Sequence, residues 1–444
     1  MSGRVTIVGG GLAGCEAAWH LARAGVPSDL HEMRPVCGTE AHVGDRLAEL
    51  VCSNSFRNAT LETAVGLLKD EMRALGSLVM TIADRHRVPA GACLAVDREG
   101  FAVEMTRAIE AEPLVRIVRG EMTSLPDGPT ILATGPLTSP ALSAALAAAL
   151  GKTHLYFYDA IAPTIATDSI DLNIAWRQSR YDKGGDDYVN CPLDRERYYA
   201  FVDAVLAAEK VPARDFERVV YFEGCMPIEE MARRGRDTLA FGPMRPVGLV
   251  DPRTGRRPFA AVQLRQDDAA GRLHNMVGFQ TKMTYPEQRR VFRMIPGLER
   301  TEFVRLGSLH RNTFVNAPEL LLPSLQVASR RSLFLAGQIV GVEGYVESAA
   351  MGILAATNLA RWLRGAPMAI PPRTTALGSL LAYVTERGKK HFQPMNANYG
   401  LFPPLARPLR GREKKRALAE RGLADLARWR AELAAAPAGT ASVA

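Results

Sequence analysis

The chain of 444 residues, 47% apolar and 23% charged, is long enough to bury a large core and to form two or three structural units. Its apolar runs are interrupted before the roughly 20 residues that a membrane span needs, and no secretory pattern opens it, which predicts a cytoplasmic protein with no membrane partner. Lysine and arginine number 55 against 47 acidic residues, and the net charge of +8 suits either a polyanionic partner or a merely basic surface.

A dinucleotide-binding fingerprint lies near the start. Residues 4–8 read as a short strand and residues 16–24 as a helix. The G-x-G-x-x-G turn between them is formed by Gly9, Gly10, Gly11, Leu12, Ala13 and Gly14. In this motif the glycines allow a tight turn, close approach of a pyrophosphate and packing of the helix on the strand. Residues 27–32 read as the second strand, and Glu32, 18 residues after Gly14, is expected to bind a ribose hydroxyl pair.

The chain next presents Cys52, directly after Leu50-Val51 and before Ser53-Asn54-Ser55. A buried, inert cysteine is one interpretation of this residue. In FAD proteins with two dinucleotide-type halves, however, the loop after the second strand approaches the flavin ring. The position of Cys52 therefore favours a thiol that faces the flavin.

Two later segments favour FAD over NAD. Residues 130–136 and 332–338 read as buried strands that end at glycine, as in the internal motifs of FAD enzymes, and the second leads into a helix of small residues. The N-terminus of that helix would face the flavin pyrimidine edge. The cofactor contacts expected here are Gly135, Gly337, Gln338, Glu343, Gly344 and Tyr345.

The order of these segments predicts an α/β protein with a two-dinucleotide, Rossmann-like FAD-binding fold of the glutathione-reductase type. The first part of the FAD-binding domain would span residues 1–151 and the second part residues 306–375. An inserted mixed α/β substrate domain would occupy residues 152–305, and residues 376–444 would form a helical, basic C-terminal region. Nine basic and three acidic residues between 407 and 430 suit either a solvated helix or a phosphate-contacting surface.

Cys225, in the inserted region, lies between a strand-like run and the acidic start of a helix. A helix N-terminus lowers the pKa of a thiol, although Glu229 and Glu230 oppose that effect. A thiolate here could add to C6 of a uracil ring and make C5 nucleophilic enough to accept a one-carbon unit. A structural cysteine is the alternative that the residues alone leave open.

His310, in a segment expected to be a loop, could stack on an aromatic ligand or move a proton. Arg311 and Asn312 could bind a carboxylate or a pterin amide, and all three also read as ordinary loop residues. The six cysteines contain no C-x-x-C or C-x₄-C pair and no histidine spacing typical of zinc. This predicts no metal site and argues against a flavin disulfide reductase, which needs two neighbouring cysteines at its cofactor.

Four segments resemble the folate- and FAD-dependent tRNA (uracil-5-)-methyltransferases: residues 9–18, 51–56, 222–229 and 337–345. The resemblance runs from near Val5 to at least Asn398. It implies methylation of a T-loop uridine in tRNA at C5, with methylenetetrahydrofolate as carbon donor and FAD reduced by NAD(P)H.

For the site, the resemblance implies that Cys225 activates uracil at C6, that Cys52 is the flavin-side thiol and that His310 stacks on folate. One rival interpretation is the related FAD- and folate-using enzyme of the tRNA wobble uridine, whose members are longer. Another is a flavin oxidoreductase with no RNA substrate, and a third is a non-catalytic RNA-binding protein that keeps FAD for structural reasons. Intact Cys52 and Cys225 argue against the third.

Overall fold

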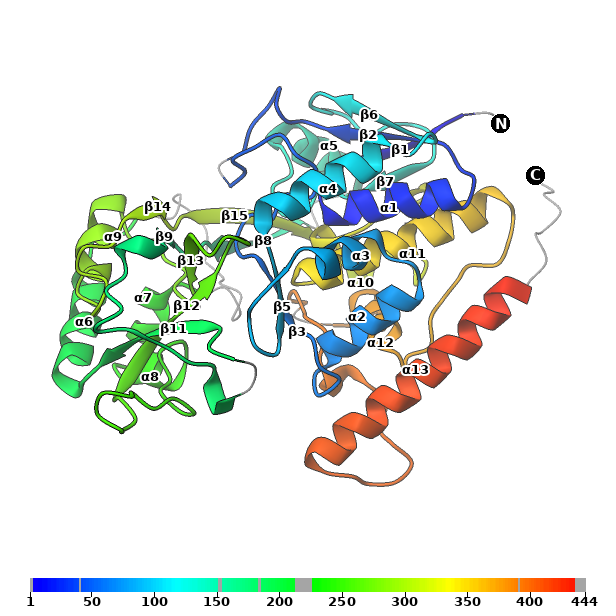
Figure 1. The fold of residues 1–444 in the computed structure, drawn as a ribbon. Helices are drawn as coiled ribbons and strands as arrows, with labels where there is room; N and C mark the ends of the chain where they lie inside the picture. Colours follow the sequence, from blue (N-terminus) through cyan, green and yellow to red (C-terminus); the bar gives the residue numbers. More distant parts are fainter. Residues whose placement is uncertain are drawn as a thin grey trace.

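The computed structural model describes residues 3–39, 41–150, 154–182, 185–211, 226–389 and 392–435. The molecule has a larger and a smaller lobe (Figure 1). A two-stranded antiparallel ribbon, β8 (His154–Ala160) with β15 (Leu309–Val315), lies where the two lobes meet. No helix within the described ranges is long and apolar enough to cross a membrane.

The larger lobe is built on a six-stranded sheet in the order β16-β17-β7-β1-β2-β6. Neighbouring strands run parallel except β16 and β17. The bounds are β1 Val5–Val8, β2 Ser28–Glu32, β6 Val115–Arg119, β7 Thr130–Leu132, β16 Gln326–Val327 and β17 Arg330–Leu335. Ile7 pairs with both Leu30 and Ile131, and all three are fully buried, as expected for parallel strands covered on both faces.

Two helices pack closely beside this sheet, α1 (Leu12–Arg23) and α11 (Tyr345–Leu363). Their backbones approach so closely at Gly352 that a Cβ there would lie 2.2 Å from the carbonyl oxygen of Ala13. The contact brings the helix that follows the glycine turn against the helix that begins at Tyr345. Segments more than 300 residues apart in the chain thereby lie side by side.

Further helices and a small sheet complete the larger lobe. The helices are α2 Ala64–Ala74, α3 Leu78–Arg85, α4 Arg98–Glu110, α5 Pro140–Leu150 and α10 Ala317–Leu320. The small sheet has the order β3-β5-β4, with bounds Ser55–Asn58, Cys93–Val96 and Arg87–Val88. The strand β3 begins just after Cys52, so this sheet fixes one end of the segment that carries the thiol.

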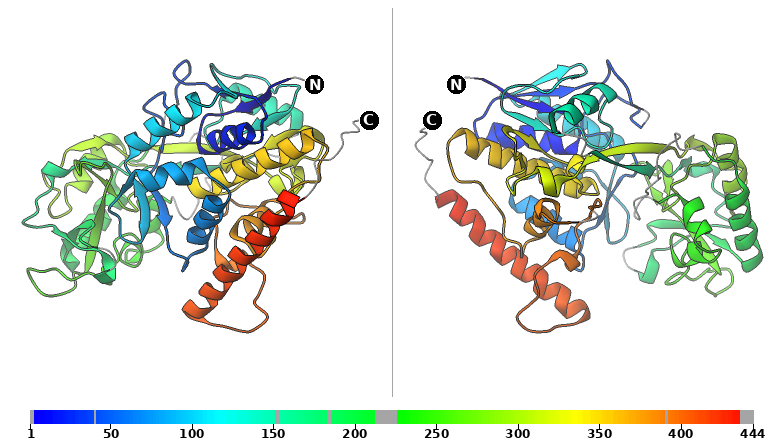
Figure 2. Two further views of the ribbon diagram at one scale, coloured as in Figure 1. Left: turned by 45° about the vertical axis from the view of Figure 1, so that its right-hand side comes forward. Right: turned by 180° about the vertical axis from the view of Figure 1, so that it is seen from behind.

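The C-terminal region folds back on the larger lobe as α12 (Ala376–Thr385) and the long α13 (Gly411–Ala435). Buried Glu71 accepts the backbone N–H groups of Ala376 and Leu377 at 2.7 and 2.8 Å, which caps α12 and ties it to α2. Figure 2 shows α13 lying along the outside of the larger lobe from two further directions.

The smaller lobe contains a second six-stranded sheet, antiparallel throughout, in the order β10-β11-β12-β13-β9-β14. Its bounds are β9 Thr164–Ala166, β10 Trp176–Arg177, β11 Tyr188–Leu193, β12 Ala260–Gln266, β13 Leu273–Met276 and β14 Phe303–Arg305. Its described helices are α6 Arg195–Ala207, α7 Ile228–Arg233, α8 Thr238–Phe241 and α9 Tyr285–Phe292.

The two faces of β12 differ sharply. Val262 and Leu264 belong to a separate apolar core of the smaller lobe. Gln263 and Arg265, which alternate with them, are also buried and lie on the opposite face. A polar sheet face that is buried needs hydrogen-bond partners, and Arg265 finds its partners in the larger lobe, beside Cys52.

His274 on β13 is a fully buried titratable residue of the smaller lobe. The Thr167 hydroxyl donates to the Gly271 carbonyl oxygen, so it accepts from Nδ1–H of His274 at 2.8 Å. The opposite nitrogen, Nε2, has no hydrogen-bond partner within the described structure. Burial, with a smaller contribution from Arg177, lowers the pKa of His274 to about 4.

We therefore expect the protein to lose stability as the pH falls from about 6.5 towards 4. In that interval the unfolded state binds a proton at His274 that the folded state does not, which amounts to about 3 kcal/mol over the whole range. Urea unfolding at several pH values measures how the free energy of unfolding changes with pH. This free energy should fall less steeply with decreasing pH in His274→Gln than in the original protein. If the free energy of unfolding changed equally with pH in both proteins, His274 would not be the residue that causes this pH dependence.

Candidate functional site

The carboxyl ends of the parallel strands surround a pocket, the place where an open α/β sheet binds its ligand. Among the residues predicted from the sequence, those that line it are Gly9, Gly10, Gly11, Leu12, Ala13, Glu32, Gly135, Gly337, Gln338 and Tyr345. The turn after β1 and the start of α1 thus form one wall, and the segments after β7 and β17 form the others.

The glycines of the first turn have different roles. A Cβ on Gly9, whose φ is +108°, would lie 2.4 Å from the carbonyl oxygen of Ala133, and one on Gly14 would lie 1.8 Å from that of Gly9. Neighbouring backbone atoms therefore leave no room for a side chain at either position. Gly11, in contrast, has nothing within 4 Å of its Cβ position, although it lines the pocket. The free space above Gly11, at the N-terminus of α1, fits a pyrophosphate.

Three of the predicted cofactor residues do not line the pocket. Gly14 serves the packing of α1 on β1, as described above. Gly344 precedes α11 with φ +114°, and the Arg57 guanidinium occupies the space that a Cβ would need. The Glu343 backbone N–H donates to Met395 at 2.8 Å. In this structure both Glu343 and Gly344 hold the start of α11 in place behind the pocket.

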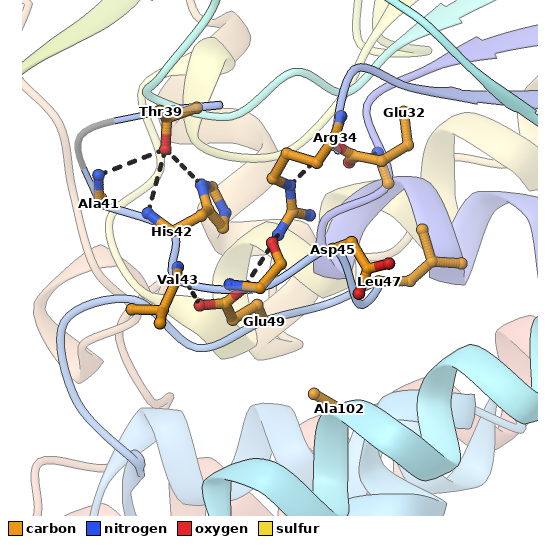
Figure 3. A network of polar contacts seen from close by, with 12 residues as sticks. Glu32, Arg34, Thr39, Ala41, His42, Val43, Asp45, Leu47, Glu49 and Ala102 are labelled. Carbon is orange, nitrogen blue, oxygen red and sulfur yellow. Dashed lines mark hydrogen bonds and ion pairs between the residues drawn. The ribbon is translucent and has the colours of Figure 1, made fainter. Parts of the chain in front are cut away.

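The acid predicted for ribose binding, Glu32, is held in a network that the sequence did not indicate (Figure 3). Its carboxylate accepts the Gly10 N–H at 3.0 Å and the Nε–H of Arg34 at 2.9 Å. Burial by itself would raise the pKa of Glu32, but the hydrogen bonds and charge of Arg34 outweigh it, so the pKa is lowered. Glu32 is therefore a carboxylate at neutral pH.

Arg34 extends the network to Glu49, whose carboxylate it contacts at 3.0 Å. Glu49 also accepts the backbone N–H groups of Val43 and Gly44 at 2.8 and 3.1 Å, which ties down the segment that carries His42 (Figure 3). Arg34, His42 and Glu49 all line the pocket. The available sequence signal was Arg34, a charged residue two positions after the acid that was predicted to bind ribose.

Cys52 lies against the phenol of Tyr345, which lines the pocket. The Tyr345 oxygen accepts the N–H groups of Cys52 and Ser53 at 2.9 and 3.2 Å and lies 3.1 Å from the Cys52 sulfur. Burial first, and then the neighbouring Cys52, raises the pKa of Tyr345, so the phenol keeps its proton. Because both lone pairs of the oxygen accept amides, the hydroxyl hydrogen is left for Sγ, where it stabilises a thiolate.

Two arginines add positive charge near this thiol. Arg98 donates to the Leu50 carbonyl oxygen, and Arg305 donates to that of Ala41 at 2.8 Å. Burial, and then the charge of Arg98, lowers the pKa of Arg305, while Tyr345 and Cys52 raise it. Arg98 thus contacts the chain two residues before Cys52, and positive charge beside a thiol favours its thiolate form.

Cys225 lies outside the described residues. The described chain resumes just beyond it, and α7 begins at Ile228. Glu229 in the first turn of α7 is buried, accepts the Thr281 hydroxyl and has a pKa raised chiefly by burial. The Glu230 carboxylate pairs with Lys282.

His310, Arg311 and Asn312 lie on the strand β15, in register with Asp159, Tyr158 and Phe157 of β8. The expectation of a loop here was wrong. The following Thr313-Phe314-Val315 favours a strand, and β8 supplies the pairing partner that the sequence alone did not reveal.

The basic helix predicted near the C-terminus is α13. Some of its cations are paired, such as Arg416 with Glu420 and Arg412 with Glu62. Lys414 and Lys415 are exposed. Its inner face, with Leu418 and Trp429, is buried against the larger lobe. Within the described ranges, no three His, Cys, Asp or Glu side chains lie together as a metal ion would require.

Comparison with known proteins shows which family the chain matches. The family model described as glucose inhibited division protein A matches residues 4–367. A methylenetetrahydrofolate–tRNA-(uracil-5-)-methyltransferase TrmFO from Geobacter sulfurreducens is 61% identical over 431 residues, which cover 97% of this chain and 99% of the relative. The protein of the same name from Rhodospirillum rubrum is 60% identical, with coverage of 96% and 92%.

The fold has solved counterparts in two crystal forms of Aquifex aeolicus GidA. Form II superimposes with a TM-score of 0.69 at 16% identity, covering 96% of this chain and 73% of that one, and form I gives 0.65 at 17% identity, covering 87% and 71%. At this identity the likeness establishes the fold. Together with the full-length relatives, it shows that the chain belongs to the glucose inhibited division protein A family and, within it, to the methylenetetrahydrofolate–tRNA-(uracil-5-)-methyltransferases.

Proposed function

We propose that this protein methylates C5 of a T-loop uridine in tRNA, with methylenetetrahydrofolate as carbon donor, FAD as cofactor and NAD(P)H as reductant. The observation that carries the proposal is the Cys52 thiol, held against Tyr345 at a dinucleotide pocket. Relatives that are 56–61% identical over nearly the whole chain carry the name of this activity. We place the enzyme in the cytoplasm, where its tRNA substrate is found.

The residues of the larger lobe bind and orient the cofactor. Gly11 leaves space for the pyrophosphate at the N-terminus of α1, and Glu32 is aligned by Gly10 and Arg34 for the adenosine ribose. Gly337 lets the segment after β17 pack against the start of α1, because a Cβ there would lie only 2.9 Å from the Cβ of Ala13. When bound, FAD supplies the reducing equivalents that convert the transferred one-carbon unit to a methyl group.

The two thiols divide the remaining chemistry. We assign to Cys225 the addition to C6 of uracil: a C6–S bond forms, and C5 then bonds to the one-carbon unit. Loss of the C5 proton breaks the bond between that carbon and its carrier nitrogen, which leaves an exocyclic methylene on C5. Two-electron reduction of this methylene to a methyl group expels the sulfur and restores the ring double bond. Cys52 is the flavin-side thiol. A hydrogen bond from the Tyr345 hydroxyl and the positive charge of nearby Arg98 would favour its thiolate form, which can accept a proton or bond transiently to carbon.

The smaller lobe and the C-terminal helix serve the substrates. We propose residues 152–305 as the substrate domain between the two parts of an FAD-binding domain, 1–151 and 306–375, and His310, Arg311 and Asn312 as folate-binding residues. A target base has to leave its stacked loop to reach the pocket, which calls for cationic contacts with the RNA backbone. The exposed Lys414 and Lys415 in the 376–444 region fit that need.

The test is direct. Purified protein should be yellow and should form 5-methyluridine in unmodified tRNA when methylenetetrahydrofolate and NADPH are both present. Mass spectrometry of nuclease fragments should place the methyl group in the T-loop. Modification at the wobble uridine would favour the related wobble enzyme, and flavin turnover without any tRNA product would favour an oxidoreductase. Methyl transfer from S-adenosylmethionine alone would rule the proposal out.

A further inference from the structure

The segment that carries Cys52 is held at both ends by arginines. On the N-terminal side, Arg98 donates to the Leu50 carbonyl oxygen. Its other terminal nitrogen bonds both carboxylate oxygens of Asp267, at 3.0 and 3.2 Å. Asp267 directly follows β12, so this first contact already connects the thiol segment to the smaller lobe.

On the C-terminal side the holding residue is Arg265, on β12 itself. Its Nε donates to Asn54 Oδ1 at 3.0 Å and its Nη2 to Ser53 Oγ at 2.7 Å. The side-chain amide of Asn54 in turn donates to the carbonyl oxygens of Val96 and Gln266, both at 2.9 Å. Arg265 is only 6% exposed, so its two bonds are shielded from water and are strong.

The two acceptors of Arg265 directly follow Cys52 in the chain. Ser53 also shares the Tyr345 phenol with Cys52 through its backbone N–H. A shift of Ser53 therefore moves the sulfur relative to the phenol that stabilises it. A guanidinium suits this position because its rigid, planar fork spans two acceptors, which the single ammonium group of lysine cannot do in the same geometry.

We propose that Arg265 is a positioning residue. From the sheet of the smaller lobe it donates hydrogen bonds to Ser53 and Asn54, and these bonds fix the Cys52 thiol against Tyr345. The expected effect of Arg265 on methyl transfer rests on the proposed function. Its effect on the position of the Cys52 segment rests on the hydrogen bonds alone. The position of the thiol then depends on the contacts that Arg265 of the smaller lobe makes with the segment after Cys52. Arg265 acts through Cys52 and does not itself touch the reacting atoms.

The test compares Arg265→Met and Arg265→Lys with Arg272→Ala, a control on the same lobe whose side chain is 81% exposed. We expect Arg265→Met to lower kcat about 100-fold, the effect of misplacing a reacting group by about 1 Å, with KM for tRNA and FAD content unchanged. Arg265→Lys should recover only part of the loss. The combined loss of kcat in Ser53→Ala with Arg265→Met should be smaller than the product of the two single losses, because both changes remove the hydrogen bond between Arg265 and Ser53.

A second measurement does not depend on methyl transfer. Iodoacetamide labelling of the FAD-loaded protein, followed by mass spectrometry of the Cys52 peptide, should be about tenfold faster in Arg265→Met, because the segment opens locally. The Arg272→Ala control should label at the original rate. Unchanged labelling and kcat in a folded Arg265 variant would overturn the proposal, as would loss of FAD in parallel with activity. An unaltered protein that made no 5-methyluridine would contradict the proposed function instead, and the labelling rates would still decide on Arg265.

Discussion

Gly11→Ala is expected to give a folded protein that binds FAD more weakly, whereas Gly14→Ala, three residues away, is expected to prevent folding. The Gly11 backbone, at φ −77° and ψ −171°, suits alanine, and a methyl group there meets no protein atom within 4 Å. The methyl group would, however, occupy the space reserved for the pyrophosphate. FAD affinity should fall at least about tenfold, or 1.4 kcal/mol.

At Gly14 the added methyl carbon would lie 1.8 Å from the carbonyl oxygen of Gly9, which is backbone and cannot move aside. Either α1 separates from β1 or the turn is rebuilt, and both lose core packing. The cost should be about 4 kcal/mol or more, which few single substitutions reach. Soluble yield, the apparent Tm and visible flavin absorbance separate the two outcomes.

Gly128→Ala is the matched control, because its Cβ also meets nothing within 4 Å and it lies away from the pocket lining. This variant should keep both the fold and the flavin. If Gly11→Ala retained FAD at the original affinity, the pyrophosphate would have to bind elsewhere. The assignment of the first glycine turn to the cofactor would then be wrong.

The order of the main elements could be predicted because each signal is local. The first glycine turn, the acid at the end of the second strand and the two later strands ending in glycine lie within short stretches, and each is fixed by its own turn and burial pattern. The strands around Ile7, Ile131 and Leu335 accordingly form the central sheet. The helices α12 and α13 likewise lie in the region 376–444, for which the sequence predicted helical structure.

What could not be predicted depends on contacts between distant segments. The hydrogen bonds of Cys52 with Tyr345 join residues 293 positions apart, and those of Arg265 with Ser53 and Asn54 span more than 200. The spacing of apolar residues along the chain predicts local helices and strands, but it does not predict contacts between such distant residues. The strand at His310 was missed for the same reason, since its partner β8 lies about 150 residues earlier.

The second prediction with a large effect concerns the two thiols. Cys52→Ala and Cys225→Ala should each lower 5-methyluridine formation by about 10⁴-fold or more, the scale of loss when a reacting group is removed. Both should keep FAD, because the glycine turn, Glu32 and Gly337 line the pocket independently of the Cys52 sulfur. Cys37→Ser, whose thiol makes only a weak contact with the neighbouring Gly38, should keep full activity.

A covalent adduct distinguishes the roles of the two cysteines. With tRNA and no folate, mass spectrometry should find a protein–uracil adduct in Cys52→Ala, because Cys225 can still add to C6, and none in Cys225→Ala. If the adduct formed in Cys225→Ala and not in Cys52→Ala, Cys52 would be the residue that attacks uracil. Loss of FAD from Cys52→Ala would make Cys52 a packing residue of the cofactor pocket. Because Tyr345 holds the Cys52 sulfur at 3.1 Å, beside the pocket that Tyr345 itself lines, we expect the first result.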